Sequence, residues 1–114
     1  AIAMYGMVLK TGENESLYTL ANLYKGMALL KKGEYDTSAV VFQKILAESR
    51  HFSEEALVGL ATAHYSGGNY EMSKEVYSSV PDLFPDSLWL PYVEKRLKEV
   101  NKKIAEQKEK DSDG

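Results

Sequence analysis

The sequence predicts an all-α protein in which two antiparallel helix hairpins stack on one another, with a flanking N-terminal helix and a C-terminal capping helix. Three observations favour this fold: apolar residues recur at helical spacing, glycines separate the helices, and one segment recurs after 35 residues. The length of 114 residues fits one domain. With 44% apolar and 27% charged residues, the composition is that of a folded protein rather than a disordered one.

The internal repeat is the most specific of these observations. Residues 27–45, MALLKKGEYDTSAVVFQKI, align without gaps with residues 62–80, TAHYSGGNYEMSKEVYSSV. A helical hairpin cannot bury both faces of its apolar stripe alone, whereas a stack of hairpins can. The repeat therefore predicts two stacked hairpins. The identical aligned pairs are Ala28/Ala63, Gly33/Gly68, Tyr35/Tyr70, Ser38/Ser73 and Val41/Val76.

The first hairpin is expected at residues 19–52. Its first helix is expected to be capped by Asn14 or Ser16 and to run to about Lys32. The helix carries an apolar stripe and ends in a basic turn, Lys31 and Lys32, which complements the helix dipole. Gly33 follows, and glycine suits the left-handed conformation in which many helices end. The second helix has its own apolar stripe, made of Tyr35, Ala39, Phe42, Ile45 and Leu46.

The second hairpin is expected at residues 53–86. Ser53 is a favourable N-cap for its first helix, and two glutamates follow it in the first turn. Gly67 and Gly68 then break the chain between the two helices. Pro81 is expected to stop the second helix, because proline lacks the backbone N–H that a helix interior needs.

The N-terminal residues 1–18 are expected to form a lead-in helix or turn. Ala1–Leu9, AIAMYGMVL, is interpreted as a short helix, because such a helix has a neighbour on which to pack. The end of a removed signal or anchor, a cloning scar and a truncated helix are the alternatives for this segment.

The C-terminal residues 87–108 are expected to form the capping helix, beginning at Pro91, and residues 109–114 are expected to fray. Such a cap is needed because the last repeat of a stack exposes an apolar face. A coiled-coil seam is the alternative interpretation of its apolar stripe. That stripe consists of Val93, Leu97, Val100 and Ile104.

The spacing of these residues resembles the tetratricopeptide repeat, a helical hairpin of about 34 residues. In the first unit the pattern of that family falls on Gly26, Gly33, Tyr35 and Phe42. In the second unit it falls on Leu60, Ala61, Gly68, Tyr70, Tyr77 and Pro85. Lys25 departs from the pattern, since it replaces a large apolar residue, and we expect an exposed edge there. The resemblance covers residues 19–85 and implies a short right-handed solenoid.

The residues that could carry chemistry do not form a catalytic or metal-binding set. There are no cysteines, and the two histidines, His51 and His64, are interpreted as a surface residue and a packed ring. Glu54 and Glu55 are adjacent on a helix and do not face each other, so a role at the helix start is expected. The turn at residues 67–69 lacks the Lys and the Ser or Thr of a phosphate loop. We therefore expect no enzyme activity, no metal and no cofactor.

Net charge and hydropathy restrict the partners. The formal net charge of −3 provides no basic surface for nucleic acid, and the basic residues near the C-terminus alternate with glutamates. No apolar run reaches the roughly 18 residues that a membrane span needs. We expect a soluble protein, cytoplasmic or periplasmic, whose partner is another protein or a peptide.

The predicted function is that of a protein–protein interaction scaffold or adaptor. The resemblance implies that the first helix of each repeat lines a concave groove for a partner segment. One subset of the family uses lysines and asparagines in this groove to hold a C-terminal carboxylate, and we expect no such clamp here. A flanking helix that fills the groove, self-assembly into a homo-oligomer, and a targeting or regulatory role within a larger protein are the alternatives. The groove residues that the resemblance implies are Leu20, Leu23, Met27, Leu30, Glu55, Val58, Thr62 and Tyr65.

Overall fold

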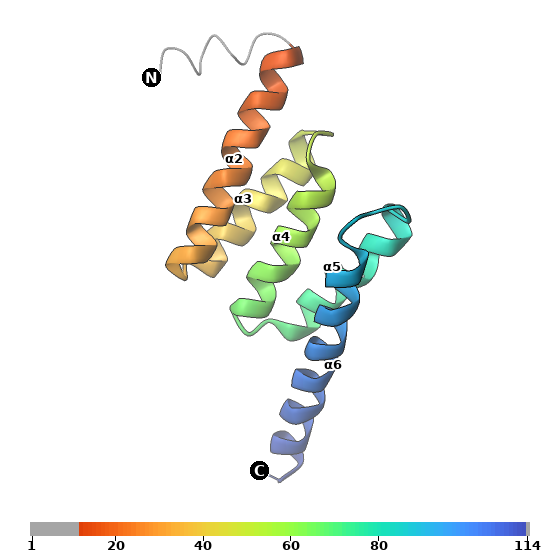
Figure 1. The fold of residues 1–114 in the computed structure, drawn as a ribbon. Helices are drawn as coiled ribbons and strands as arrows, with labels where there is room; N and C mark the ends of the chain where they lie inside the picture. Colours follow the sequence, from red (N-terminus) through yellow and green to blue (C-terminus); the bar gives the residue numbers. More distant parts are fainter. Residues whose placement is uncertain (1–11, 114) are drawn as a thin grey trace.

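The computed structural model describes residues 12–113, with side chains described from residue 15 to residue 110. These residues form helices and no strands, which confirms the all-α prediction. Each helix packs against the next one along the chain, as expected for successive hairpins (Figure 1). The short helix predicted at Ala1–Leu9 lies outside the described residues. The helices are α2 (Gly12–Lys32), α3 (Tyr35–Glu48), α4 (Ser53–Ser66), α5 (Tyr70–Leu83) and α6 (Leu90–Asp113).

The turns within the two hairpins have the same backbone geometry. Gly33 and Gly68 adopt φ angles of 83° and 84°, the left-handed region that glycine enters without a Cβ penalty. In both turns the next residue donates its N–H to the carbonyl five residues earlier, over 3.0 Å from Glu34 and 2.8 Å from Asn69. The repeat in the sequence is therefore also a repeat in the backbone.

In each hairpin one buried serine joins the two helices by the same kind of hydrogen bond. Ser38 Oγ donates to the carbonyl of Gly26 over 2.7 Å, and Ser73 Oγ donates to the carbonyl of Ala61 over 2.9 Å. Both serines are fully buried, so these hydrogen bonds satisfy hydroxyls that have no access to water. The internal repeat thus extends from the backbone to the side chains.

Phe42 of α3 fills the space where the two hairpins meet. Its ring is fully buried, and glycines of two other helices face it. A Cβ added at Gly26 of α2 would lie 2.8 Å from the ring, and one added at Gly59 of α4 would lie 2.6 Å from it. The close approach of three helices therefore depends on glycine at both positions. Tyr77, which follows Phe42 by one repeat, is equally buried in the second hairpin.

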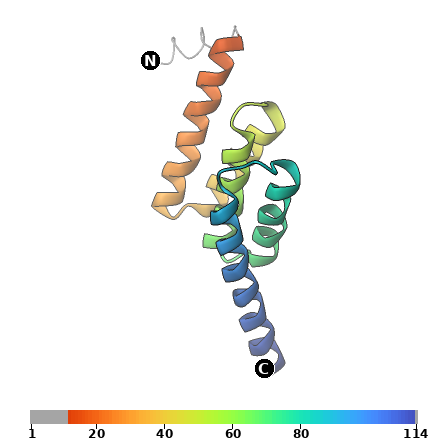
Figure 2. The ribbon, with the colours of Figure 1, turned by 45° about the vertical axis from the view of Figure 1, so that its right-hand side comes forward.

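Two apolar clusters lie on either side of α4. The first combines residues of α2, α3 and α4, and the second combines residues of α4, α5 and α6. Within the second cluster Val93, Val100 and Ile104 are buried and Leu97 is half-buried, so the stripe predicted for the last helix packs inward. The C-terminal part of α6 extends past the other helices (Figure 2), and the molecule measures 57 × 30 × 19 Å.

The predicted N-cap of α4 is wrong. Ser53 is the first residue of the helix, and its Oγ donates to the carbonyl of Arg50 over 3.3 Å. The capping position belongs to Phe52, which adopts φ 59° and ψ 26°, a left-handed conformation that is rare for a bulky residue. The side chain of Phe52 packs against the first apolar cluster, and this burial offsets the backbone strain.

The predicted stop at Pro81 is also wrong, because α5 continues to Leu83. Pro81 removes only its own N–H from the ladder, and the N–H of Phe84 still donates to the carbonyl of Val80 over 2.7 Å. Pro85 explains the end of the helix, since a residue that precedes proline is disfavoured in the helical conformation. Phe84 accordingly has φ −134° and ψ 71°.

The last helix is longer than predicted, whereas the first agrees with the prediction to within a few residues. A helix from Asn14 or Ser16 to about Lys32 is expected from the sequence, and α2 runs from Gly12 to Lys32. α6 begins at Leu90 and continues to Asp113, beyond the end expected at residue 108. The extension follows from residues 107–110, QKEK, all of which have high helix propensity.

Candidate functional site

An open apolar hollow of about 350 Å³, the α2–α4 hollow, lies between the first helices of the two hairpins. Its floor includes the ring of Phe42 from α3 and the backbone at Gly59 of α4. Trp89, which directly precedes α6, and Tyr92 of α6 complete it on the remaining side. Glu55 is the one carboxylate among the lining residues. Together they are Leu23, Met27, Leu30, Phe42, Glu55, Val58, Gly59, Thr62, Trp89 and Tyr92.

The structure brings six of the eight predicted groove residues together at this hollow and places two elsewhere. Leu20 packs against the first apolar cluster. Tyr65 packs against the second, where its ring meets Tyr70 edge-to-face at 5.6 Å and the Arg96 guanidinium lies 4.8 Å from its centre. The six that line the hollow are Leu23, Met27, Leu30, Glu55, Val58 and Thr62.

These six residues differ in how far a partner can reach them. Leu23 and Val58 are buried, so they form part of the core as well as the floor of the hollow. Met27 is 49% exposed, and Leu30, Glu55 and Thr62 are half-buried. Met27 is therefore the lining residue whose substitution disturbs the core least.

Trp89 and Tyr92 also line the hollow, and reasoning from the sequence missed both of them. A signal for them was present, because Leu23, Val58 and Val93 follow one another at intervals of 35 residues and all three are buried. The start of α6 therefore occupies the place of a third first helix in the stack. A helix at that place contributes to the same surface as α2 and α4.

The segment before α6 is held against α4 by Ser87. Ser87 Oγ donates to Glu54 Oε2 over 2.8 Å and accepts the N–H of Trp89 over 3.0 Å. The Trp89 ring in turn meets the Tyr92 ring edge-to-face, with centroids 5.8 Å apart. These contacts fix the aromatic wall of the hollow before any partner arrives, which lowers the ordering cost of binding.

A hydrogen-bonded cluster fixes Tyr92 from the other side. Thr62 Oγ1 lies 2.7 Å from the Tyr77 hydroxyl and 3.3 Å from the Tyr92 hydroxyl, and Arg96 Nε donates to the Tyr92 hydroxyl over 3.1 Å. Burial raises the pKa of Tyr77. Burial acts in the same direction on Tyr92, but the hydrogen bonds that its hydroxyl makes with Thr62 and Arg96 outweigh it and lower the pKa of Tyr92. The cluster joins α4, α5 and α6 and so stabilises the shape of the hollow.

The remaining chemical groups do not meet at this hollow. His64 is buried, as predicted, and is not among the lining residues. Burial lowers the pKa of His64, while the negative charge of Asp36 opposes this shift. Among the residues with described side chains, no three or more potential metal ligands come together. Within the described helices, none is both long and apolar enough to span a bilayer.

Helical hairpins that repeat in register, with an open apolar surface on the first helices, define a protein of the repeat class whose members present surfaces to other molecules. The family model of the tetratricopeptide repeat matches residues 29–90, and the chain belongs to this family. Repeats of this family are generally protein–protein interaction modules. Neither a curated protein nor a solved structure matches the chain.

Proposed function

We propose that this chain is a scaffold or adaptor that holds an apolar segment of a partner protein in the α2–α4 hollow. The open and almost wholly apolar lining of this hollow is the observation that carries the proposal. The lining residues that a partner can reach, above all Met27, Trp89 and Tyr92, form the proposed contact surface. We assign no catalytic role to the chain.

The chemistry of these side chains supports the proposal. Apolar surface that a partner removes from water contributes about 25 cal/mol per Å² before the costs of association. Tryptophan and tyrosine are residue types that carry much of the binding energy in protein interfaces. The unbranched side chain of Met27 adapts to different partners. Neither lysine nor asparagine lines the hollow, so the proposal does not include a carboxylate clamp.

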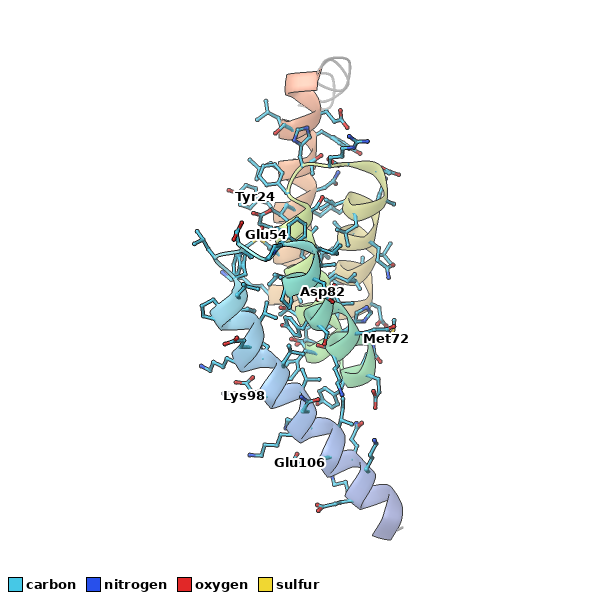
Figure 3. The ribbon with its side chains drawn as sticks, turned by 90° about the vertical axis from the view of Figure 1, so that its right-hand side faces the viewer. Tyr24, Glu54, Met72, Asp82, Lys98 and Glu106 are labelled. Atoms are coloured by element: carbon cyan, nitrogen blue, oxygen red, sulfur yellow. The ribbon has the colours of Figure 1, made fainter. Side chains whose placement is uncertain are left out.

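The test uses peptides that are selected from a random display library on the immobilised protein. Their affinities are then measured for the wild type and for Met27→Glu and Met72→Glu. Met27 is 49% exposed in the hollow and Met72 is 48% exposed on α5, so the two substitutions are matched in chemistry and exposure. Figure 3 shows Met72 on the opposite side of the stack from Tyr24 and Glu54. Leu23 is not used, because it is buried and its substitution tests folding.

We expect Met27→Glu to weaken binding at least tenfold and Met72→Glu to leave it unchanged. The reason is that a carboxylate at Met27 must lose its hydration when an apolar segment covers it. Circular dichroism of both variants checks that the fold survives. Equal affinities for the wild type and a folded Met27→Glu variant would show that the partner binds elsewhere.

The outer face of α2 favours self-assembly as a second candidate. Leu17 and Tyr24 on this face are 57% and 61% exposed, whereas the first hairpin covers the equivalent residues of the second hairpin, Phe52 just before α4 and Gly59 within it. However, Tyr24 occupies the position in α2 that Gly59 occupies in α4, where the absence of a side chain makes room for the Phe42 ring. The side chain of Tyr24 blocks this position, so a second copy cannot stack on α2 in the register of the repeat. Light scattering over a wide concentration range tests this candidate. A mass that stays at 12.8 kDa contradicts it, and a mass that rises with concentration supports it.

A further inference from the structure

We infer that the partner segment carries a lysine or arginine beside its apolar side chains, and that the Glu55 carboxylate binds this cation. The inference rests on the proposed function, because it concerns the partner of the same hollow. It specifies the chemical class of that partner: an apolar segment with a neighbouring positive charge, rather than a neutral or acidic one.

Glu55 differs from every other residue that lines the hollow. The others are apolar or aromatic side chains, a glycine and Thr62, whose hydroxyl is engaged with Tyr77 and the Val58 carbonyl. The adjacent Glu54 already accepts the hydroxyl of Ser87 over 2.8 Å. Among the residues with described side chains, no cation lies within ion-pair distance of Glu55. Its carboxylate is thus the charged group of the hollow that has capacity for a further ligand.

The position of Glu55 makes the charge of the partner matter. Glu55 is half-buried, and an apolar segment seated in the hollow removes more water from its carboxylate. An ionised group that loses hydration is destabilised unless a charge of opposite sign replaces the water. A cation on the partner offsets this cost, whereas a carboxylate on the partner adds repulsion. Glu55 therefore discriminates between partners more than it adds affinity.

The dimensions of the hollow agree with a short segment as its occupant. Its volume of about 350 Å³ lies at the lower end of the range for ligand pockets, roughly 300–1,000 Å³. Such a volume takes a few side chains of one segment. The cation that meets Glu55 therefore comes from the same segment as the apolar side chains.

The test compares three capped synthetic peptides with the same leucines and no aromatic residues, in which the positions that flank the leucines are all Lys, all Gln or all Glu. Binding is followed by the fluorescence of Trp89, the one tryptophan of the chain, which lies in the wall of the hollow. We expect the Lys peptide to bind the wild type about tenfold more tightly than the Glu peptide, with the Gln peptide between them. The difference shrinks as salt is added.

Two charge-reversal variants separate the local effect of Glu55 from the net charge of the protein. Glu55→Lys should reverse the order of the Lys and Glu peptides. Glu75→Lys changes the net charge equally but lies on the exposed side of α5, so it should preserve the order. Equal binding of the Lys and Glu peptides, or an unchanged order in Glu55→Lys, overturns the inference and leaves the proposed function standing.

The emission of Trp89 also shows whether something other than a partner peptide occupies the hollow. If none of the peptides changes the emission of Trp89, the inference and the proposed function both fail. An emission shift on dilution without peptide assigns the hollow to a second copy of the chain. An emission shift on removal of residues 1–9 assigns it to that segment. Either of these two results overturns the inference.

Discussion

Replacement of Gly59 by alanine tests the packing at the floor of the hollow. A Cβ at Gly59 would lie 2.6 Å from Cε1 and Cζ of Phe42 and 2.9 Å from Cε2. Carbon atoms in contact normally lie about 3.5–4.0 Å apart, so the ring must move by about 1 Å. Gly26 on α2 prevents this movement, because it also faces the end of the ring.

The expected effect of Gly59→Ala on the free energy of unfolding is the difference between two opposing contributions. Overpacking of a closed core costs typically about 1–3 kcal/mol, and the clash with three atoms of a fully buried ring places Gly59→Ala near the upper end. Alanine in a helix interior is favoured over glycine by about 1 kcal/mol. Gly59→Ala should therefore lower the free energy of unfolding by about 2 kcal/mol.

A second substitution reverses the sign of this effect. Phe42→Leu removes the ring atoms Cε1, Cε2 and Cζ that meet the added methyl group, at its own cost in core packing. In that background Gly59→Ala should keep only the propensity gain and stabilise the protein by roughly 0.5–1 kcal/mol. The coupling between the two substitutions is then about 2–3 kcal/mol, within the range for residues in direct contact.

Urea unfolding followed by far-UV circular dichroism measures the four free energies of this cycle. With a slope of about 2 kcal/mol per M, a loss of 2 kcal/mol moves the midpoint by about 1 M. The reasoning is refuted if Gly59→Ala stabilises the wild type, or if the effect of Gly59→Ala is the same in both backgrounds.

Three further predictions use the same unfolding assay. Ser38→Ala and Ser73→Ala should each cost about 1 kcal/mol, because each removes an equivalent buried hydrogen bond; a difference of more than twofold contradicts that equivalence. Gly68→Ala should lower the free energy of unfolding by about 1–2 kcal/mol because its φ of 84° is unfavourable for alanine. No atom lies within 4 Å of the added Cβ, so no steric clash contributes, and an unchanged stability contradicts this prediction. Burial lowers the pKa of His64 below its usual 6.5, so the unfolded chain binds more protons and stability should fall as the pH drops below about 6.5. His64→Gln should abolish this slope and His51→Gln should not; a slope that survives in His64→Gln contradicts the assignment.

The fold was predictable from the sequence because its determinants are local and occur twice. Gly33 and Gly68 are each required by a positive φ angle, and their spacing shows the period directly. The serines at 38 and 73 mark the same helix–helix contact in both hairpins. Each of these residues recurs after 35 residues in the sequence and has the same structural role in both hairpins.

The missed features depend on contacts between residues far apart in the chain. The left-handed backbone of Phe52 is stabilised by burial of its ring, whereas the local sequence favours Ser53 as the cap. The aromatic wall of the hollow depends on the bond between Ser87 and Glu54, which are 33 residues apart. The 35-residue interval from Val58 to Val93 indicates that the start of α6 continues the stack, but the hydrogen bond that fixes Trp89 in the wall leaves no local signal in the sequence.

The most direct test of the central claim is the mapping of a selected peptide on the protein by amide and indole chemical shifts. The indole N–H of Trp89 gives a single resonance, because the chain has one tryptophan. If the α2–α4 hollow is the binding site, the largest shifts fall on Trp89 and on the amides of Met27, Val58 and Thr62. Shifts confined to Leu17 and Tyr24 on the outer face of α2, or to the exposed side of α5, contradict the claim.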